Sequence, residues 1–124
     1  MNMKKILIVD DEPNIVMTLE YTFKKSNFEV FIARDGHEAL EIIKNSVPDM
    51  IILDIMMPNV DGFATLEQIR KDKNLEHTKV MFLSAKNKAS DIEKGLALGA
   101  DAYMTKPFSI KKVVEQVHFL LQIS

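Results

Sequence analysis

The sequence predicts a doubly wound α/β domain, in which helices cover both faces of a parallel five-stranded sheet. Short apolar runs alternate with longer segments whose apolar residues follow helical spacing, and this βα unit recurs five times in the 124 residues. Strands that are apolar almost throughout are typical of parallel strands buried on both faces. Right-handed crossover connections then restrict the topology to a few doubly wound arrangements.

The first two βα units are expected in the N-terminal third of the chain. The apolar run Ile6–Val9 predicts a strand, and acidic residues follow it directly. Apolar residues at helical spacing come after Pro13, which suits a first helical turn because its missing N–H needs no partner there. Residues 29–33 predict the second strand, and Gly36 precedes the second helix.

The remaining three βα units follow the same pattern, beginning with the strand Met50–Leu53. Proline, asparagine and glycine cluster after this strand and predict a loop. Gly99 is typical of a helix C-terminal cap, because glycine adopts the left-handed conformation that such a cap requires. The elements expected after the central strand are a loop over residues 55–62, a helix from Phe63, a strand over residues 80–83, a helix over residues 89–98, a strand over residues 101–105 and a final helix over residues 110–121.

Length and composition fit one globular domain over residues 1–124. The net charge of −2 argues against direct nucleic-acid binding, which needs a basic face. The chain has no cysteine, so disulfides and thiolate metal sites are excluded. The apolar run near the N-terminus is too short for a signal peptide, and no run reaches the length of a membrane span. We therefore expect a cytoplasmic protein without membrane contacts.

Polar residues stand where four of the five predicted strands end. Asp10 and Asp11 follow the first strand, Asp54 the third, Ser84 the fourth and Lys106 the fifth. The C-terminal ends of parallel strands share one edge of the sheet, and ligands of such sheets bind at that edge. Three carboxylates, one hydroxyl and one ammonium are therefore expected around a single crevice.

This set of side chains favours phosphoryl-transfer chemistry at Asp54. Crowded carboxylates repel each other, and a divalent cation relieves that repulsion. Oxygen ligands without histidine or cysteine favour Mg²⁺, with Mn²⁺ as the alternative. Asp54 follows the central strand and is the natural nucleophile, because carboxylate attack on phosphorus gives an acyl phosphate. Lys106 and Ser84 can contact the phosphoryl oxygens.

Each of these residues also has a structural explanation when it is taken alone. Acids before Pro13 favour a helix N-terminus, a lone serine is often a structural hydroxyl, and a lone lysine is usually a solvated charge. Their joint position at the strand ends of one sheet edge favours the functional interpretation.

The chain closely resembles the receiver domains of bacterial two-component response regulators over essentially its whole length. Four motifs in this order and spacing make the resemblance specific. They are Ile8-Val9-Asp10-Asp11-Glu12-Pro13, Asp54-Ile55-Met56-Met57-Pro58 with Asp61-Gly62, Leu83-Ser84-Ala85, and Lys106-Pro107-Phe108.

The resemblance implies a flavodoxin-like fold with strand order 2-1-3-4-5 and a phosphoryl-accepting Asp54. Asp11 and Asp54 match direct Mg²⁺ ligands of the family, and Asp10 matches an acid that acts through water. The backbone carbonyl of Met56 matches the remaining protein ligand. The phosphodonor would be a sensor histidine kinase or a phosphotransfer protein, and the chain would be a self-phosphorylating switch rather than a turnover enzyme.

Ser84 and Lys106 match the phosphate-contacting pair of the family, in which the Lys106-Pro107 peptide is expected to be cis. Ser84 and Tyr103 match its two switch positions, where the hydroxyl moves toward the phosphate and the ring turns inward. Such a change biases a two-state loop and helix. The implied output surface spans residues 88–122 and addresses an unknown downstream effector.

Two variable positions predict a slowly hydrolysed phosphoryl group. Met56 lies two residues after Asp54, and Lys86 lies two residues after Ser84. In the family these positions flank the route of the hydrolytic water. Neither side chain offers a hydrogen-bond acceptor that could orient water.

One departure concerns dimerisation through the output surface. Winged-helix transcription factors of the family often pair through salt bridges there, and Asp101 fits that pattern. Ala102, Lys112 and Gln116 replace the expected charged partners, so a dimer of that type is not expected.

Two other classes of function are alternatives for the same architecture. A flavin- or nucleotide-binding module would need a small-residue loop after the first strand to hold phosphate, and Asp10-Asp11-Glu12 instead repels phosphate unless a metal intervenes. An aspartate-nucleophile phosphatase would place its nucleophile after the first strand with a second acid two residues later, where Glu12 stands. Both alternatives rank below the switch.

Overall fold

A computed structural model describes residues 3–123 and contains one five-stranded sheet in the order β2-β1-β3-β4-β5, with all neighbouring strands parallel. The predicted doubly wound topology is therefore confirmed. The strands are β1 Lys5–Val9, β2 Glu29–Ala33, β3 Met50–Leu53, β4 Lys79–Ser84 and β5 Ala102–Thr105. The helices are α1 Pro13–Lys25, α2 Gly36–Asn45, α3 Gly62–Lys71, α4 Ala89–Ala97 and α5 Ile110–Leu121, with a short 3-10 helix η1 at Lys73–Leu75.

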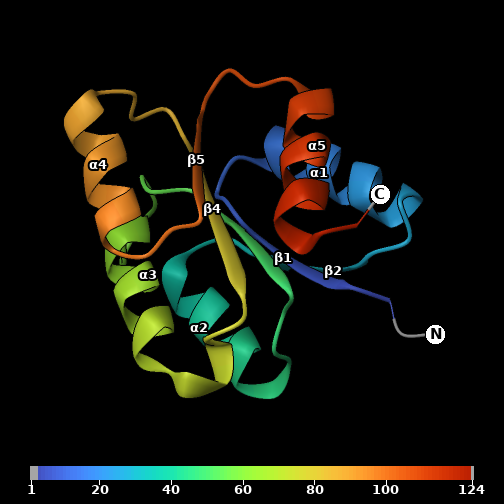
Figure 1. Ribbon diagram of the computed structural model, residues 1–124, viewed down its shortest axis with the longest axis horizontal. Helices are drawn as coiled ribbons and strands as arrows, with labels where there is room; N and C mark the ends of the chain where they lie inside the picture. The colour runs from blue at the N-terminus through green and yellow to red at the C-terminus, as the bar shows by residue number, and fades with distance from the viewer. Residues whose placement is uncertain (1–2, 124) are drawn as a thin grey trace.

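The sheet separates two layers of helices. Helices α1 and α5 cover one face, and α2, α3 and α4 cover the other (Figure 1). Each central strand packs against both helix layers, because its successive side chains point to opposite faces of the sheet. Ile6 and Ile8 pack with α1 and α5, whereas Leu7 and Val9 pack with α2 and α3. This double burial explains why the strands are apolar at most positions, apart from their ends, rather than at alternate ones.

Local signals define the ends of several helices as predicted. Pro13 occupies the first turn of α1, and Gly99 after α4 has a positive φ of 109°. The short helix η1 was not predicted, because three residues are too few to produce a periodic pattern. Asp72 caps η1 by accepting a hydrogen bond from the Asn74 amide, and Leu75 from η1 is buried.

Gly62, at the start of α3, allows the loop after β3 to fold back against Asp54. Its amide donates to the Ile55 carbonyl at 2.9 Å. A Cβ atom at this position would lie 2.2 Å from the Asp54 carbonyl oxygen and 2.7 Å from the Ile55 Cα. Backbone atoms cannot move aside cheaply, so a larger residue must displace the segment that carries Asp54.

We expect Gly62→Ala to lower the free energy of unfolding by about 2 kcal/mol, because the steric conflict outweighs the better helix propensity of alanine. Urea denaturation would measure the change. Ala64→Gly is the control, since it reverses the same exchange at an exposed position of α3 and should lower stability by about 1 kcal/mol. A stabilised Gly62→Ala variant would contradict the close approach.

Among residues 3–123, no helix has the length and apolar character needed to cross a membrane.

Candidate functional site

Strand register brings Asp10 and Asp54 together at the C-terminal edge of the sheet. Val9 pairs with Leu53 at the ends of β1 and β3, and the Asp54 amide donates to the Val9 carbonyl at 2.9 Å. Asp10 and Asp54 are therefore the first residues beyond two adjacent strand ends. Both are only 3% exposed, so two carboxylates are buried side by side.

Ser84 and Lys106 come to the same edge through the neighbouring pair of strands. Ser84 is the last residue of β4 and pairs with Thr105 of β5. The Lys106 amide then donates to the Ser84 carbonyl at 2.9 Å. Ser84 is fully buried, and the peptide bond from Lys106 to Pro107 is cis, as the family resemblance implied.

The Lys106 ammonium contacts three carboxylates, which lie in the segments that follow β1 and β3. Its Nζ atom lies 2.8 Å from Glu12 Oε1, 3.0 Å from Asp10 Oδ2 and 3.4 Å from Asp54 Oδ2. The side chain of Lys106 is only 10% exposed, so these ion pairs are shielded from water on the lysine side. One buried cation therefore balances part of the charge of a three-carboxylate group.

Burial and charge pull the pKa values of this group in opposite directions. Burial raises the pKa of Asp10 above its usual value, although hydrogen bonds from the Glu12 amide and from Lys106 oppose that rise. Burial alone would lower the pKa of Lys106. Hydrogen bonds to Glu12 and Asp10, together with the charges of Asp54 and Asp10, outweigh it and hold the pKa of Lys106 above its ordinary value.

The carboxylates that gather closely enough to hold a cation are those of Asp10, Glu12 and Asp54. One oxygen of each lies within 4.8 Å of the others. Asp11 is exposed and is not part of this group, although the sequence predicted it there with Asp10 and Asp54. The Met56 side chain is 59% exposed, and only its backbone carbonyl was expected to face the group.

Glu12 was not among the three carboxylates that the sequence predicted at the sheet edge. Successive residues of an extended segment point to alternate sides. Glu12 is therefore expected on the same side as Asp10, two residues earlier, with Asp11 on the other side. That spacing was the available signal for its position.

The chain is similar to known proteins in both sequence and fold. Residues 6–118 match the family model described as the response regulator receiver domain. The chain belongs to this family. It is a receiver domain of two-component signalling, and the order of its strands is that of its structural relatives.

Individual relatives agree with the family assignment. The receiver domain is 44% identical over 121 residues to the alkaline phosphatase synthesis transcriptional regulatory protein PhoP of Bacillus subtilis, covering 98% of this chain and 50% of that protein. The chain thus spans about half the length of this curated relative.

Solved structures of relatives have the same fold as this receiver domain. The receiver domain of Francisella response regulator 1452 matches with a TM-score of 0.88 and 36% identity, over 96% of this chain and 97% of that one. The Vibrio cholerae chemotaxis protein CheY4 matches with a TM-score of 0.90 and 28% identity, over 96% of this chain and 99% of that one.

The two expected switch residues of the receiver domain both contact the backbone of Lys86. The Ser84 hydroxyl accepts a hydrogen bond from the Lys86 amide at 3.3 Å, and the Tyr103 hydroxyl donates to the Lys86 carbonyl at 2.7 Å. The Tyr103 ring packs on Phe82 with ring centres 5.7 Å apart. The loop after β4 is thus held by both residues at the same peptide segment.

Gly95 lets helix α4 approach the Tyr103 ring in the receiver domain. A Cβ atom there would lie 3.0 Å from the Phe82 ring and 3.1 Å from the Tyr103 ring. The position of α4 and that of the ring are therefore sterically coupled.

Asp101 of the receiver domain is engaged within its own chain. Its carboxylate accepts from Arg70 Nη2 at 3.0 Å and from the Val80 amide at 2.8 Å. Arg70 also donates to the carbonyls of Gly99 and Thr78. This network joins α3, β4 and the segment before β5.

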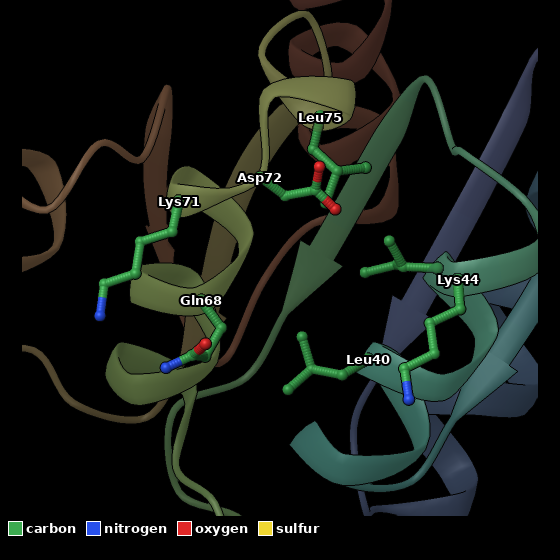
Figure 2. A pocket seen from close by; sticks show the side chains of 7 residues that line it. Leu40, Lys44, Gln68, Lys71, Asp72 and Leu75 are labelled. Atoms are coloured by element: carbon green, nitrogen blue, oxygen red, sulfur yellow. The ribbon is translucent and has the colours of Figure 1, made fainter.

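Two surface hollows differ in their relation to the carboxylates. A groove of about 490 Å³ opens beside Lys106 and is lined by Glu12, Ile15, Ala85, Lys106, Pro107 and Phe108. A second hollow, of about 370 Å³, lies between α2 and α3, with Lys44 and Lys71 on opposite sides (Figure 2). Leu40 and Leu75 face this second space, which adjoins the starting ends of the strands and contains no part of the carboxylate group.

Proposed function

We propose that this receiver domain is a phosphorylation-dependent switch in which Asp54 accepts a phosphoryl group. The observation that carries the proposal is the buried contact of the Lys106 ammonium with Asp54 and Asp10 at the ends of adjacent strands. A buried carboxylate beside a fixed cation suits attack on a phosphoryl group, because the cation is positioned where negative charge gathers.

In the transfer step, an Asp54 carboxylate oxygen forms a bond to phosphorus while the bond from phosphorus to the donor breaks. The donor atom leaves with the electron pair of that bond. Asp54 Oδ1 accepts the Ile55 amide at 2.7 Å, which fixes the orientation of the carboxylate. Lys106 and the Ser84 hydroxyl are proposed to contact the transferred phosphoryl oxygens. The groove beside Lys106 offers a route for the donor.

Mg²⁺ is the proposed cofactor, with Mn²⁺ as an alternative, held by Asp10, Asp11, Asp54 and the backbone carbonyl of Met56. The carboxylate oxygens of Asp10, Glu12 and Asp54 lie within 4.8 Å of one another, and such hard oxygens support this choice over metals that prefer nitrogen or sulfur. When bound, such a cation neutralises charge on the transferring group. Asp11 is exposed, so its side chain has room to turn toward the other acids.

The proposed switch couples Ser84 to Tyr103 through Lys86. The Ser84 hydroxyl accepts a hydrogen bond from the Lys86 amide. A phosphoryl group on Asp54 would be stabilised if this hydroxyl moved to donate a hydrogen bond to it. Movement of that loop also changes the acceptor of the Tyr103 hydroxyl. We propose that the α4-β5-α5 face carries this change to an effector, and that Gly95 transmits it to α4 by direct contact with the ring.

The proposed phosphodonor is a sensor histidine kinase or a phosphotransfer protein in the cytoplasm. The proposed unit is the whole segment 1–124, acting as a switch that promotes its own phosphorylation and dephosphorylation rather than as a turnover enzyme. The effector is a separate protein or another part of a longer regulator.

Incubation with Mg²⁺ and acetyl phosphate, followed by intact-mass measurement, tests the proposal. We expect one phosphoryl adduct per chain, and no adduct when Mg²⁺ is removed by chelation. Hydroxylamine should remove the adduct, because it cleaves acyl phosphates. An unmodified chain in the presence of Mg²⁺ and donor would contradict the proposal.

The phosphoryl group is expected to hydrolyse slowly, persisting for many minutes after donor removal. Met56 and Lys86 offer no acceptor to orient the attacking water, and the Met56 side chain is 59% exposed. Decay of the adduct can be followed by intact mass after desalting. Met56→Asn is expected to accelerate decay, because its amide oxygen can orient water. Decay of the parent adduct within a minute or so would contradict this prediction.

A further inference from the structure

We propose that Glu12 is a positioning residue that holds Lys106 back from Asp54 before phosphoryl transfer. This inference rests on the proposed function of Asp54. Of the three acidic partners of Lys106, Glu12 is the nearest, at 2.8 Å, and Asp54 is the most distant, at 3.4 Å. The ammonium thus contacts the future phosphoryl site least closely.

The position of Glu12 just before helix α1 supports a role outside the helix itself. Glu12 is the N-cap residue of α1, yet its side chain makes no capping hydrogen bond. The carboxylate points instead to a lysine 94 positions later in the chain. A capping hydrogen bond therefore does not account for its orientation, since a cap would accept from the first free amides of α1.

Glu12 is also the most exposed partner of the three. The Glu12 amide fixes Asp10 through Asp10 Oδ1 at 2.9 Å, and the Ile55 amide fixes Asp54. The Glu12 side chain is 57% exposed, and Lys106 is its only hydrogen-bonding partner within residues 3–123. It can therefore release Lys106 without disturbing the buried strand ends.

Release of Lys106 is required when a phosphoryl group reaches Asp54. The incoming oxygens carry negative charge and compete with Glu12 for the same ammonium. Each transfer must then break or weaken the contact between Glu12 and Lys106. Glu12 thereby slows the phosphorylation of Asp54, including its phosphorylation by donors of low reactivity.

The experiment compares phosphorylation rates with acetyl phosphate and Mg²⁺ in the parent and in Glu12→Gln, Glu12→Asp and Glu20→Gln. The Glu12 end of the ion pair is 57% exposed, so the pair is of modest strength, and we expect Glu12→Gln to be phosphorylated about twofold to fivefold faster than the parent. Glu12→Asp keeps the charge but shortens the reach to Lys106, and it should also be faster. Glu20→Gln removes an exposed ion pair with Lys24 on the same helix and should match the parent.

Added salt provides a second readout that a purely structural role would not change. Salt screens the exposed end of the pair, so the rate advantage of Glu12→Gln over the parent should shrink as ionic strength rises. If Glu12→Gln matches the parent, the proposal is overturned. If Glu12→Asp matches the parent while Glu12→Gln is faster, repulsion of the anionic donor is the cause, and the proposal is also overturned.

A measurement without any phosphodonor separates this proposal from the proposed function. The ¹⁵N resonance of the Lys106 ammonium should shift, and its protons should exchange faster with water, in Glu12→Gln relative to the parent and to Glu20→Gln. An unchanged Lys106 resonance would overturn the role of Glu12 whether or not Asp54 accepts a phosphoryl group. A shifted resonance in a protein that acquires no adduct would count against the function of Asp54 alone.

Discussion

Asp54→Asn is expected to abolish formation of the phosphoryl adduct with acetyl phosphate and Mg²⁺, lowering its rate by more than about a hundredfold. The amide oxygen of asparagine is a far weaker nucleophile than a carboxylate. It can still accept the Ile55 amide, which the Asp54 carboxylate accepts at 2.7 Å. The local fold should therefore survive while the reaction is lost. Intact mass measures the adduct, and circular dichroism checks the fold.

Asp49→Asn is the matched control for this variant. Asp49 directly precedes β3, and Asp54 directly follows it, so the same substitution is made at the two ends of one strand. Asp49 accepts the Lys5 amide at 2.8 Å, and asparagine can keep that bond. Full phosphorylation of Asp49→Asn is expected. An adduct retained by Asp54→Asn would assign the phosphoryl group to another residue and contradict the role of Asp54.

The residues at the sheet edge could be predicted because the ends of the strands can be located in the sequence itself. An apolar run followed by a polar residue identifies a strand and its end, and parallel strands bring those ends together. Asp10, Asp54, Ser84 and Lys106 were predicted at one edge on this basis, and strand register explains their proximity.

The individual contacts at that edge could not be predicted, because they depend on side-chain direction and on distances in three dimensions. Consecutive acids after β1 read as one charged cluster in the sequence. In the fold, Glu12 joins Asp10 and Asp54, whereas Asp11 is exposed and outside the group. The network of Arg70 with Asp101 joins residues 31 positions apart through geometry that no local pattern records.

Lys106→Met is expected to lower the free energy of unfolding at neutral pH by about 3 kcal/mol, because it leaves buried carboxylates without their cation. Asp10 and Asp54 are each only 3% exposed and both contact Lys106. Urea denaturation measures the change. Lys44→Met is the matched control, since it removes an exposed ion pair with Glu41 and should change stability by less than about 1 kcal/mol.

Acid pH should reduce the effect of Lys106→Met. The pKa of Asp10 lies above its unfolded value because of burial, so the folded state binds more protons between the two pKa values and stability rises as pH falls through that window. Lys106 lowers the pKa of Asp10, so the folded-state pKa of Asp10 should be higher in Lys106→Met. The pH range between the folded and unfolded pKa values of Asp10 then extends to higher pH. The stability difference between variant and parent should therefore shrink as the pH is lowered below neutral.

Alkaline pH and Mg²⁺ give two independent checks on the same charge balance. The folded pKa of Lys106 lies above its unfolded value, so its stabilisation is complete below about pH 10 and is lost as the pH rises toward the folded pKa. The parent should lose more stability there than Lys106→Met, because the contribution of Tyr103, whose pKa is raised by burial, is common to both proteins. Added Mg²⁺ should restore stability more in the variant than in the parent, because the cation no longer competes with an ammonium. A variant that Mg²⁺ stabilises no more than the parent would contradict competition between the two cations for these carboxylates.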